Sequence, residues 1–168
     1  MAATALVILV PELEPLLGRW RATFTGDGAA GMPPHVTLLY PFADDAEVGA
    51  HVADVKRVLA TAAPFEAEFA EVRRWPDVLY LAPEPPEPFV ALVERLLETF
   101  PQYPPYGGAY DEIVPHLTVA HGDDARFDEI AAQLVPVLPV RVRVERGWLM
   151  SEAAGKWQRH TPFTLDRR

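Results

Sequence analysis

Cysteine is absent from this sequence, which excludes disulfides, thiolate metal sites and cysteine nucleophiles. Long apolar runs are absent too, because no stretch approaches the roughly 18 consecutive apolar residues that a membrane-spanning helix needs. Residues 1–4 carry no basic side chain, and the apolar run that follows them stops at Pro11. A signal peptide is therefore not expected, and the sequence predicts a cytoplasmic protein with no membrane contact.

Basic residues are few. The chain has 15 Lys and Arg against 24 Asp and Glu, a net charge of −9, which disfavours binding to long duplex nucleic acid through its phosphates. The charge is uneven: residues 1–140 hold 8 basic and 21 acidic side chains, whereas residues 141–168 hold 7 basic and 3 acidic ones. The C-terminal segment can supply positive potential to a small anion, or it can simply form a solvated strand face.

The length and composition indicate one globular unit. The chain has 168 residues, of which 49% are apolar and 23% charged, an ordinary balance for a folded domain. No change of composition marks a flexible linker. We expect a single domain over residues 1–168 and a monomer.

Helical and strand patterns alternate along the chain. Four segments place apolar residues at helical spacing, over residues 13–24, 48–59, 89–100 and 127–138. Acidic pairs at 44–45 and 123–124 are placed to cap the second and fourth of these. Seven runs rich in branched and aromatic residues predict strands, at 5–10, 35–40, 65–73, 78–82, 116–120, 140–150 and 156–164. The order predicts an α+β fold, with mainly antiparallel sheets covered by helices on their outer faces.

One pentapeptide pattern occurs twice. Residues 34–38 read Pro-His-Val-Thr-Leu and residues 115–119 read Pro-His-Leu-Thr-Val, so both fit Pro-His-apolar-Thr-apolar. Two such matches are hard to attribute to chance. The copies are 81 residues apart, close to half the chain, which indicates two structurally related halves.

The repeat has a chemical interpretation if each copy is a strand. Side chains alternate along a strand, so His35 and Thr37 share one face, and His116 and Thr118 repeat the arrangement. If the halves pack about a pseudo-twofold axis, two imidazoles and two hydroxyls converge on one cavity. Two histidines suit general acid–base catalysis, and two hydroxyls can bind phosphate oxygens. This set fits metal-free phosphodiester cleavage, in which a nucleophile loses a proton and a leaving oxygen gains one.

Other interpretations stay open. A His-x-Thr pair can be structural, which would suit a protein-interaction domain, and the same groove can bind a nucleotide or an RNA end without turnover. A zinc site made by His35, His116 and His121 is a further alternative. It lacks a carboxylate partner at ligand spacing and leaves the threonines without a role. We therefore expect no metal and no cofactor.

The paired motifs resemble the 2H phosphoesterase superfamily, in particular the branch related to 2′-5′ RNA ligases and cyclic phosphodiesterases. The strings HVTLLYPF, PHLTVAHG and YPPYGGAYDEIVPH carry the resemblance, which covers nearly the whole chain. It implies a bilobal pseudo-twofold fold, with two sheets facing a central groove and helices outside. It also implies His35 and His116 as catalytic residues and Thr37 and Thr118 as phosphate-binding residues. The implied chemistry is metal-independent hydrolysis of 2′,3′-cyclic phosphates, or reversible ligation at 2′-5′ linkages.

The sequence departs from these relatives at two positions near the motifs. His121 stands where relatives of the RNA-ligase branch often carry Arg, so anion binding there is expected to be weaker and pH-dependent. Tyr40 lies where relatives often place Phe, which suits base stacking or simple packing. The negative net charge favours a small nucleotide over a large RNA as substrate.

Four further residues are candidates for substrate binding. Tyr106 and Tyr110, in a loop dense in Pro, Gly and Tyr, can stack on a nucleobase or cover the site as a lid. Arg141 and Arg143 share one face of a predicted strand. They add phosphate contacts if that face lines the groove, and are solvated otherwise.

Overall fold

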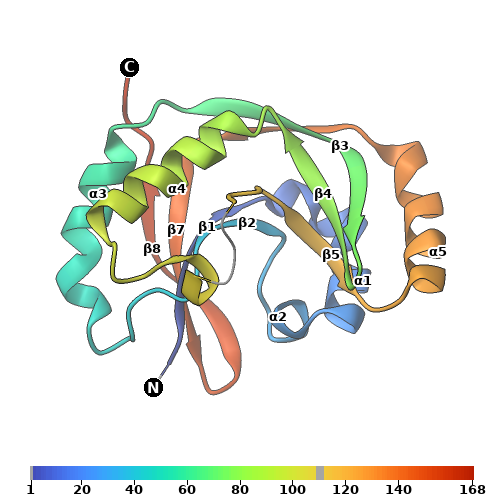
Figure 1. Ribbon diagram of the computed structural model, residues 1–168, viewed down its shortest axis with the longest axis horizontal. Coiled ribbons are helices and arrows are strands. Elements are labelled where there is room, and N and C mark those ends of the chain that lie inside the picture. The colour runs from blue at the N-terminus through green and yellow to red at the C-terminus, as the bar shows by residue number, and fades with distance from the viewer. Residues whose placement is uncertain (1, 109–111) are drawn as a thin grey trace.

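The computed structural model describes residues 2–108 and 112–168, and within them it has two four-stranded antiparallel sheets and five α-helices (Figure 1). The first sheet has the strand order β2-β1-β7-β8 and the second β5-β4-β3-β6. The strands are β1 (Thr4–Leu9), β2 (His35–Leu39), β3 (Phe65–Trp75), β4 (Val78–Glu84), β5 (Leu117–His121), β6 (Val140–Val144), β7 (Arg146–Ala153) and β8 (Lys156–Thr164). The helices are α1 (Glu14–Phe24), α2 (Gly26–Ala29), α3 (Val52–Ala60), α4 (Glu87–Thr99) and α5 (Asp124–Leu134). The predicted α+β class is confirmed.

Each sheet is covered by a helix that the chain forms between two strands of the other sheet. Helix α1 connects β1 to β2 in the first sheet, yet it packs against β5 of the second. Helix α4 connects β4 to β5 in the second sheet, yet it packs against β2 of the first. Consequently α3 and α4 lie together on one side of the molecule, and α1 and α5 on the other (Figure 1). This reciprocal exchange gives the two halves their pseudo-twofold relationship.

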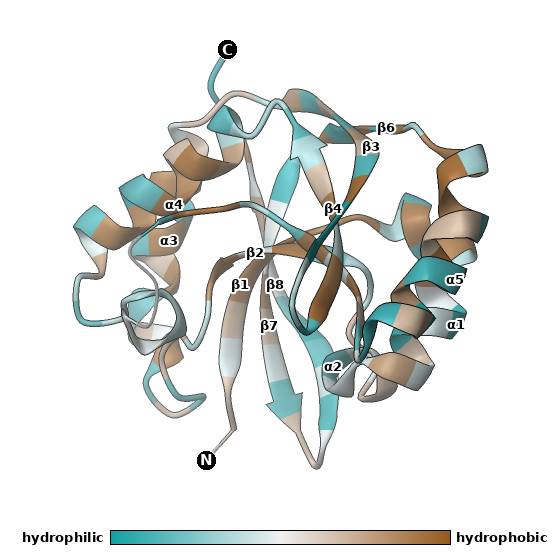
Figure 2. Ribbon diagram, turned by 45° about the vertical axis from the view of Figure 1, so that its right-hand side comes forward, coloured by the Kyte–Doolittle hydropathy of each residue, from teal (hydrophilic) through white to brown (hydrophobic). Residues whose placement is uncertain are grey.

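The two motif strands are edge strands that lie next to each other. Strands β2 and β5 each end one sheet, and they contact one another. Along β2, Val36 and Leu38 are fully buried in the core beneath the helices. Leu117 and Val119 of β5 are buried in the same core. Figure 2 shows the matching pattern on the helices, where hydrophobic and hydrophilic residues alternate as in amphipathic helices that cover sheets.

Most of the predicted strands are present, but the one predicted over residues 140–150 is wrong. The chain leaves β6 at Glu145 and starts β7 at Arg146. Strand β6 pairs with β3 in the second sheet, and β7 pairs with β1 in the first. No proline marks this crossing, and the break in the alternation of β6 is only the polar pair Glu145-Arg146, after which an apolar run resumes at once. A break this short is also typical of an irregularity within one strand, so the sequence pattern did not show that the chain changes sheets there.

Helix capping followed the prediction at one helix and not at another. The Asp123 carboxylate accepts a hydrogen bond from the Arg126 backbone N–H at 3.1 Å and caps α5 as predicted. The predicted cap by the acidic pair at 44–45 is wrong, because a 3-10 turn over Val48–His51 precedes α3. Helix α2 was not predicted; the Thr25 hydroxyl caps it by accepting from Gly28 N at 2.9 Å.

No helix within residues 2–108 and 112–168 has the length and apolar character that crossing a bilayer requires.

Candidate active site

A groove of about 1120 Å³ lies between the two sheets and brings both motifs together. Its walls come from both halves of the chain, so residues far apart in sequence share one cavity. The predicted residues that line it are His35, Thr37, Tyr40, Tyr106, His116, Thr118 and His121. The predicted convergence of two imidazoles and two threonines is therefore present in the fold.

The two histidines are held in the same way. In each, Nδ1 lies 2.8 Å from the backbone carbonyl oxygen two residues earlier, Pro33 for His35 and Val114 for His116. A carbonyl oxygen only accepts, so Nδ1 carries the proton and donates. Each neutral imidazole then keeps its lone pair on Nε2. The local geometry prepares both rings for proton transfer at the same nitrogen.

Burial shifts both imidazoles toward the neutral form. His35 is only 8% exposed, and this burial, with the nearby Arg21 cation, lowers its pKa to about 4. His116 is half-buried, and its pKa is also lowered, mainly by burial. The two rings are close enough for the charge of His116 to act on the pKa of His35. Charging either ring therefore costs more than it would in water.

A buried arginine forms hydrogen bonds to the backbone of the second motif and to the segment that leads into the first. Arg21 of α1 is 1% exposed, and its guanidinium donates to the Thr118 carbonyl oxygen at 2.7 Å and the Met32 carbonyl oxygen at 3.0 Å. The Asp27 carboxylate lies 3.6 Å from the same guanidinium. The Nε atom of Arg21 is buried without a hydrogen-bond partner. This residue was not predicted, although its helical spacing from Leu17 places a charge on the buried stripe.

Asp27 adds a negative charge at the edge of the groove. Its Oδ2 lies 3.7 Å from Nε2 of His35, and its side chain lines the groove and is about one-third exposed. Burial alone raises the Asp27 pKa, but Arg21, His35 and hydrogen bonds from Thr25 and Gly28 outweigh it, so the net pKa is below its ordinary value. Asp27 is therefore a carboxylate at neutral pH. No sequence pattern pointed to it, since it belongs to the short helix α2.

The threonines occupy the positions that strand alternation requires. Thr37 and Thr118 are half-buried and line the groove, two residues beyond their histidines. Thr37 lies opposite Val7 of β1, and Thr118 opposite Tyr80 of β4. Each hydroxyl is thus carried by a paired strand, which limits its movement relative to the neighbouring imidazole.

Aromatic side chains form part of both walls. The Trp75 ring lies 4.9 Å from the His116 ring in a T-shaped contact. On the other wall, the rings of Tyr40 and Trp157 are 6.2 Å apart. The Tyr106 backbone N–H donates to the Tyr40 carbonyl oxygen at 2.7 Å, which fixes that loop against the groove. Trp75 and Trp157 were missed, because the sequence placed them only in a turn and a hairpin.

The two arginines proposed as phosphate contacts do not line the groove. Arg141 and Arg143 are exposed on β6, at the far edge of the second sheet from β5. Arg143 donates to Glu145 at 2.9 Å, and Arg141 lies 3.5 Å from Glu68. The solvated alternative is therefore correct for both. Tyr110 lies outside the described residues.

No group of three or more His, Asp and Glu side chains in residues 2–108 and 112–168 is arranged to hold a metal ion. His35, His116 and His121 share the groove without forming such a group.

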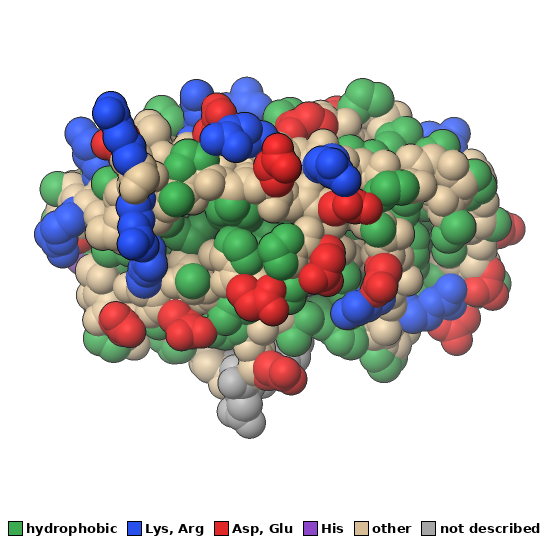
Figure 3. Space-filling model, turned by 90° about the horizontal axis from the view of Figure 1, so that it is seen from above, with side chains coloured by type: hydrophobic (Ala, Val, Ile, Leu, Met, Phe, Trp, Pro, Cys, Tyr) green, Lys and Arg blue, Asp and Glu red, His purple; other side chains and the backbone are tan. Residues whose placement is uncertain are grey.

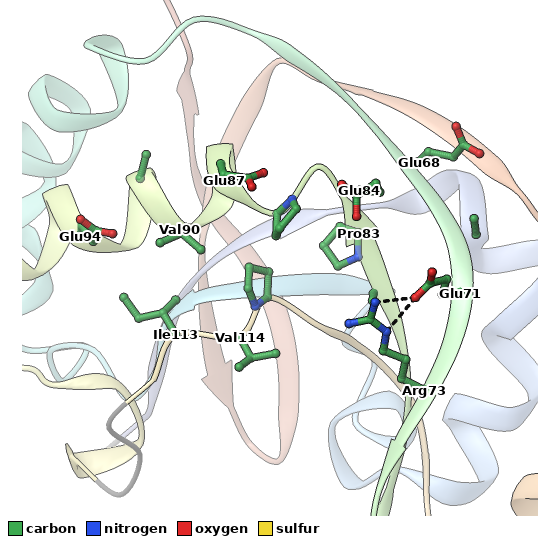
Figure 4. A pocket seen from close by; sticks show the side chains of 15 residues that line it. Glu68, Glu71, Arg73, Pro83, Glu84, Glu87, Val90, Glu94, Ile113 and Val114 are labelled. Carbon is green, nitrogen blue, oxygen red and sulfur yellow. Dashed lines mark hydrogen bonds and ion pairs between the residues drawn. The ribbon is translucent and has the colours of Figure 1, made fainter.

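A second cavity of about 620 Å³ lies behind the segment that leads into His116. Residues 113–115 line both this cavity and the groove. Its rim is acidic, and one glutamate, Glu71, is bonded to Arg73 (Figure 4). Seen from above Figure 1, acidic side chains gather around apolar ones across the middle of the molecule (Figure 3). The other glutamates that line the cavity are Glu68, Glu84, Glu87 and Glu94.

Solved structures with the same fold cover nearly the whole chain. The crystal structure of E. coli LigT complexed with NADP+ is 19% identical, with a TM-score of 0.63 over 98% of both chains. LigT complexed with 3′-AMP is 18% identical, with a TM-score of 0.65 over 98% of both chains. The structure of TT0787 from Thermus thermophilus is 21% identical, with a TM-score of 0.66 over 99% of both chains. These similarities show the fold.

A comparison with curated proteins found no match. Residues 9–156, however, match the 2′-5′ RNA ligase superfamily. This match includes both Pro-His-apolar-Thr-apolar motifs and most of the chain. The protein belongs to the 2′-5′ RNA ligase superfamily, whose fold is that of the LigT-like phosphoesterases.

Proposed function

We propose that this protein is a metal-independent cyclic phosphodiesterase that hydrolyses 2′,3′-cyclic or related cyclic phosphates of nucleotides or RNA ends. The observation that carries the proposal is the matched geometry of His35 and His116. Both rings donate from Nδ1 to a backbone carbonyl at 2.8 Å, which leaves Nε2 of each for proton transfer in one groove. Binding alone would not need two such nitrogens, so turnover is favoured over a purely binding role.

The proposed reaction needs one proton transfer from each ring. A neutral imidazole takes a proton at Nε2 from the attacking water, whose oxygen forms a bond to phosphorus. The bond between phosphorus and the leaving ribose oxygen breaks, and that oxygen takes a proton from Nε2 of the other imidazole in its protonated form. The hydroxyls of Thr37 and Thr118 donate hydrogen bonds to the non-bridging oxygens, where charge develops.

A nucleotide is the proposed substrate class. The groove volume of about 1120 Å³ accommodates a nucleotide, and Trp75, Tyr40 and Trp157 offer faces for stacking a base. LigT has been crystallised with NADP+, 3′-AMP and ATP, which supports nucleotide binding in a fold of this kind. The net charge of −9 favours a small ligand over a long RNA. A cytoplasmic location and a monomeric state remain predictions from the sequence.

The alternative is reversible 2′-5′ ligation, which uses the same residues in the opposite direction. A non-catalytic role in binding a nucleotide or an RNA end is the second alternative. Two variants separate the enzymatic functions from the binding role. A hydrolase or ligase loses its reaction when His35 or His116 is changed to Ala, whereas a binding module has no reaction to lose.

The test is incubation of the purified protein with 2′,3′-cyclic nucleotides and 2′-5′-linked dinucleotides, with and without a chelator. We expect ring opening of the cyclic nucleotides that is independent of chelator and about 10²–10⁴-fold slower in His116→Ala. Formation of 2′-5′ linkages from 2′,3′-cyclic ends would favour the ligase. The absence of any product, with binding retained, would favour the binding module.

A further inference from the structure

Asp27 lies beside the reactive nitrogen of His35 and forms an ion pair with Arg21. The guanidinium is buried, and it donates to three main-chain carbonyl oxygens, those of Thr118, Met32 and Pro33. The carboxylate is one-third exposed and lines the groove. Its Oδ2 is 3.6 Å from the Arg21 guanidinium and 3.7 Å from Nε2 of His35. The carboxylate is thus the member of the pair that a ligand in the groove can approach.

This carboxylate lies close to any phosphate held by His35. A phosphate oxygen bonded to Nε2 is about 2.8 Å from it, so with the 3.7 Å separation of Nε2 and Oδ2 it lies no more than about 6.5 Å from Asp27. Charges at that distance, partly shielded from solvent, interact appreciably. The charged and titratable groups around this point are Asp27 itself, His35 from β2, His116 and His121 at the two ends of β5, and Arg21 with Glu14 from α1.

The charge of the ligand changes during the proposed reaction. A cyclic phosphodiester carries one negative charge. Its hydrolysis gives a monoester, which loses a further proton to solvent with a pKa near 6 and becomes a dianion at neutral pH. Without Asp27, the charge of the buried Arg21 behind this wall would favour the dianion and would hold the product more tightly. The Asp27 carboxylate offsets that cation without touching the reacting atoms.

We propose that Asp27 is a specificity-determining residue, which prevents the site from favouring dianionic phosphomonoesters over monoanionic phosphodiesters and so limits inhibition by product. The role deepens the proposed function, because it assigns the charge that the substrate and the released product carry at this site. Asp27 contributes this role through its charge, and the neutral isostere Asn keeps the acceptor for the Gly28 N–H at 2.9 Å.

The test compares two ligands that contain no cyclic phosphate and therefore cannot undergo the proposed ring opening. 2′-Deoxyadenosine 3′-monophosphate and its methyl ester lack the 2′ hydroxyl and differ by one negative charge above pH 6. Calorimetry gives both dissociation constants at pH 5.5 and pH 7.5, and their ratio cancels effects common to both ligands, such as packing of the shared adenosine group. We expect the Asp27→Asn substitution to raise the affinity for the monoester, relative to that for the methyl ester, roughly fivefold at pH 7.5 and by much less at pH 5.5.

Asp166→Asn is the control, because it makes the same change in net charge at an exposed position near the C-terminus. It should leave the ratio of the wild type unchanged. An Asp27→Asn ratio equal to that of the wild type would overturn the proposal.

If Asp27→Asn does not fold, the same measurement on the wild type tests the proposal. Between pH 5.5 and pH 7.5, its affinity for the monoester relative to the methyl ester should rise by less than about threefold. A rise of about tenfold would overturn the role of Asp27. These measurements need no turnover. A protein that shows the charge effect but opens no cyclic phosphate would refute the proposed function and leave the role of Asp27 standing.

Discussion

The Arg21 guanidinium donates a 2.7 Å hydrogen bond to the backbone carbonyl oxygen of Thr118. This bond joins a helix from the first half of the chain to the strand that carries the second motif. The same side chain donates to Met32, three residues before His35. One buried side chain therefore holds the backbone of both motifs, so it links the geometry of the two histidines to the packing of α1.

Replacing this arginine should reduce both stability and activity. We expect Arg21→Met to lower the free energy of unfolding by about 2–4 kcal/mol, because buried carbonyl oxygens lose their donor and Asp27 loses its counter-charge. Denaturant unfolding checks the value. Arg57→Met is the control, since Arg57 is exposed and pairs with the exposed Asp54 on the same helix, and it should change stability by less than about 0.5 kcal/mol. Equal effects of the two substitutions would contradict the central position of Arg21.

Each imidazole should be necessary for turnover. His35→Ala and His116→Ala should each reduce kcat by about 10²–10⁴-fold. The double variant should lose far less than the product of the two single losses, because an acid without its base accomplishes little. Steady-state kinetics on a 2′,3′-cyclic nucleotide measures these effects.

His121→Ala provides the comparison within the same groove. It should raise KM and leave kcat nearly unchanged, since His121 is exposed and lies beyond the second motif. Near-normal turnover in His35→Ala would refute the two-histidine mechanism for this protein.

The buried His35 should make stability depend on pH. Its pKa is about 4 in the folded state and 6.5 in the unfolded chain, so between these values the unfolded state binds a proton that the folded state does not. Lowering the pH from 6.5 to 4 should therefore destabilise the protein, with His35 contributing up to about 3 kcal/mol of the loss. Above pH 6.5 this contribution is fully present. Unfolding curves at several pH values in the wild type and His35→Gln measure it, and equally steep losses in both proteins would disagree with this origin.

The threonine hydroxyls should matter more to rate than to folding. Thr37→Val and Thr118→Val keep the shape of the side chain and remove the donor. We expect each to weaken kcat/KM by roughly 1–3 kcal/mol, a loss of about 5- to 150-fold. Thermal unfolding of the same variants should change little. Full activity in Thr118→Val would mean that its hydroxyl does not contact the phosphate.

Chelation should leave the reaction intact. If the two imidazoles supply both proton transfers, excess chelator should reduce the rate by less than about twofold, whereas removal of a catalytic Lewis acid costs several kcal/mol. Rates before and after chelation, and after adding zinc or manganese back, provide the measurement. Collapse of the rate with recovery on adding metal would reject the metal-free proposal.

Sequence periodicity located the motif residues because strand alternation is a local property. His35 and Thr37 must share a face wherever the strand lies, and burial of Val36 and Leu38 on the other face decides which face. The half-chain spacing of the repeat indicated two related halves, and from this we expected His116 and Thr118 in the same groove. These inferences needed no knowledge of which helix packs on which sheet.

Residues that reach the site through tertiary packing were not predictable in this way. Asp27 reaches His35 only because α2 turns back toward β2, and Arg21 reaches Thr118 only because α1 covers the other sheet. Arg141 and Arg143 show the converse. Their alternation on β6 was predicted correctly, but the strand lies at the far edge of the second sheet from β5.

The reciprocal packing of α1 and α4 has a consequence for how a ligand enters. Each sheet beside the groove is covered by a helix that the chain forms between two strands of the other sheet, so neither half can swing outward as a separate body about one hinge. Moving them apart would pull α1 from β5 and α4 from β2, and would break the bond from Arg21 to Thr118. The groove therefore does not depend on closure of one lobe over the other, and it meets its ligand with both walls already in place.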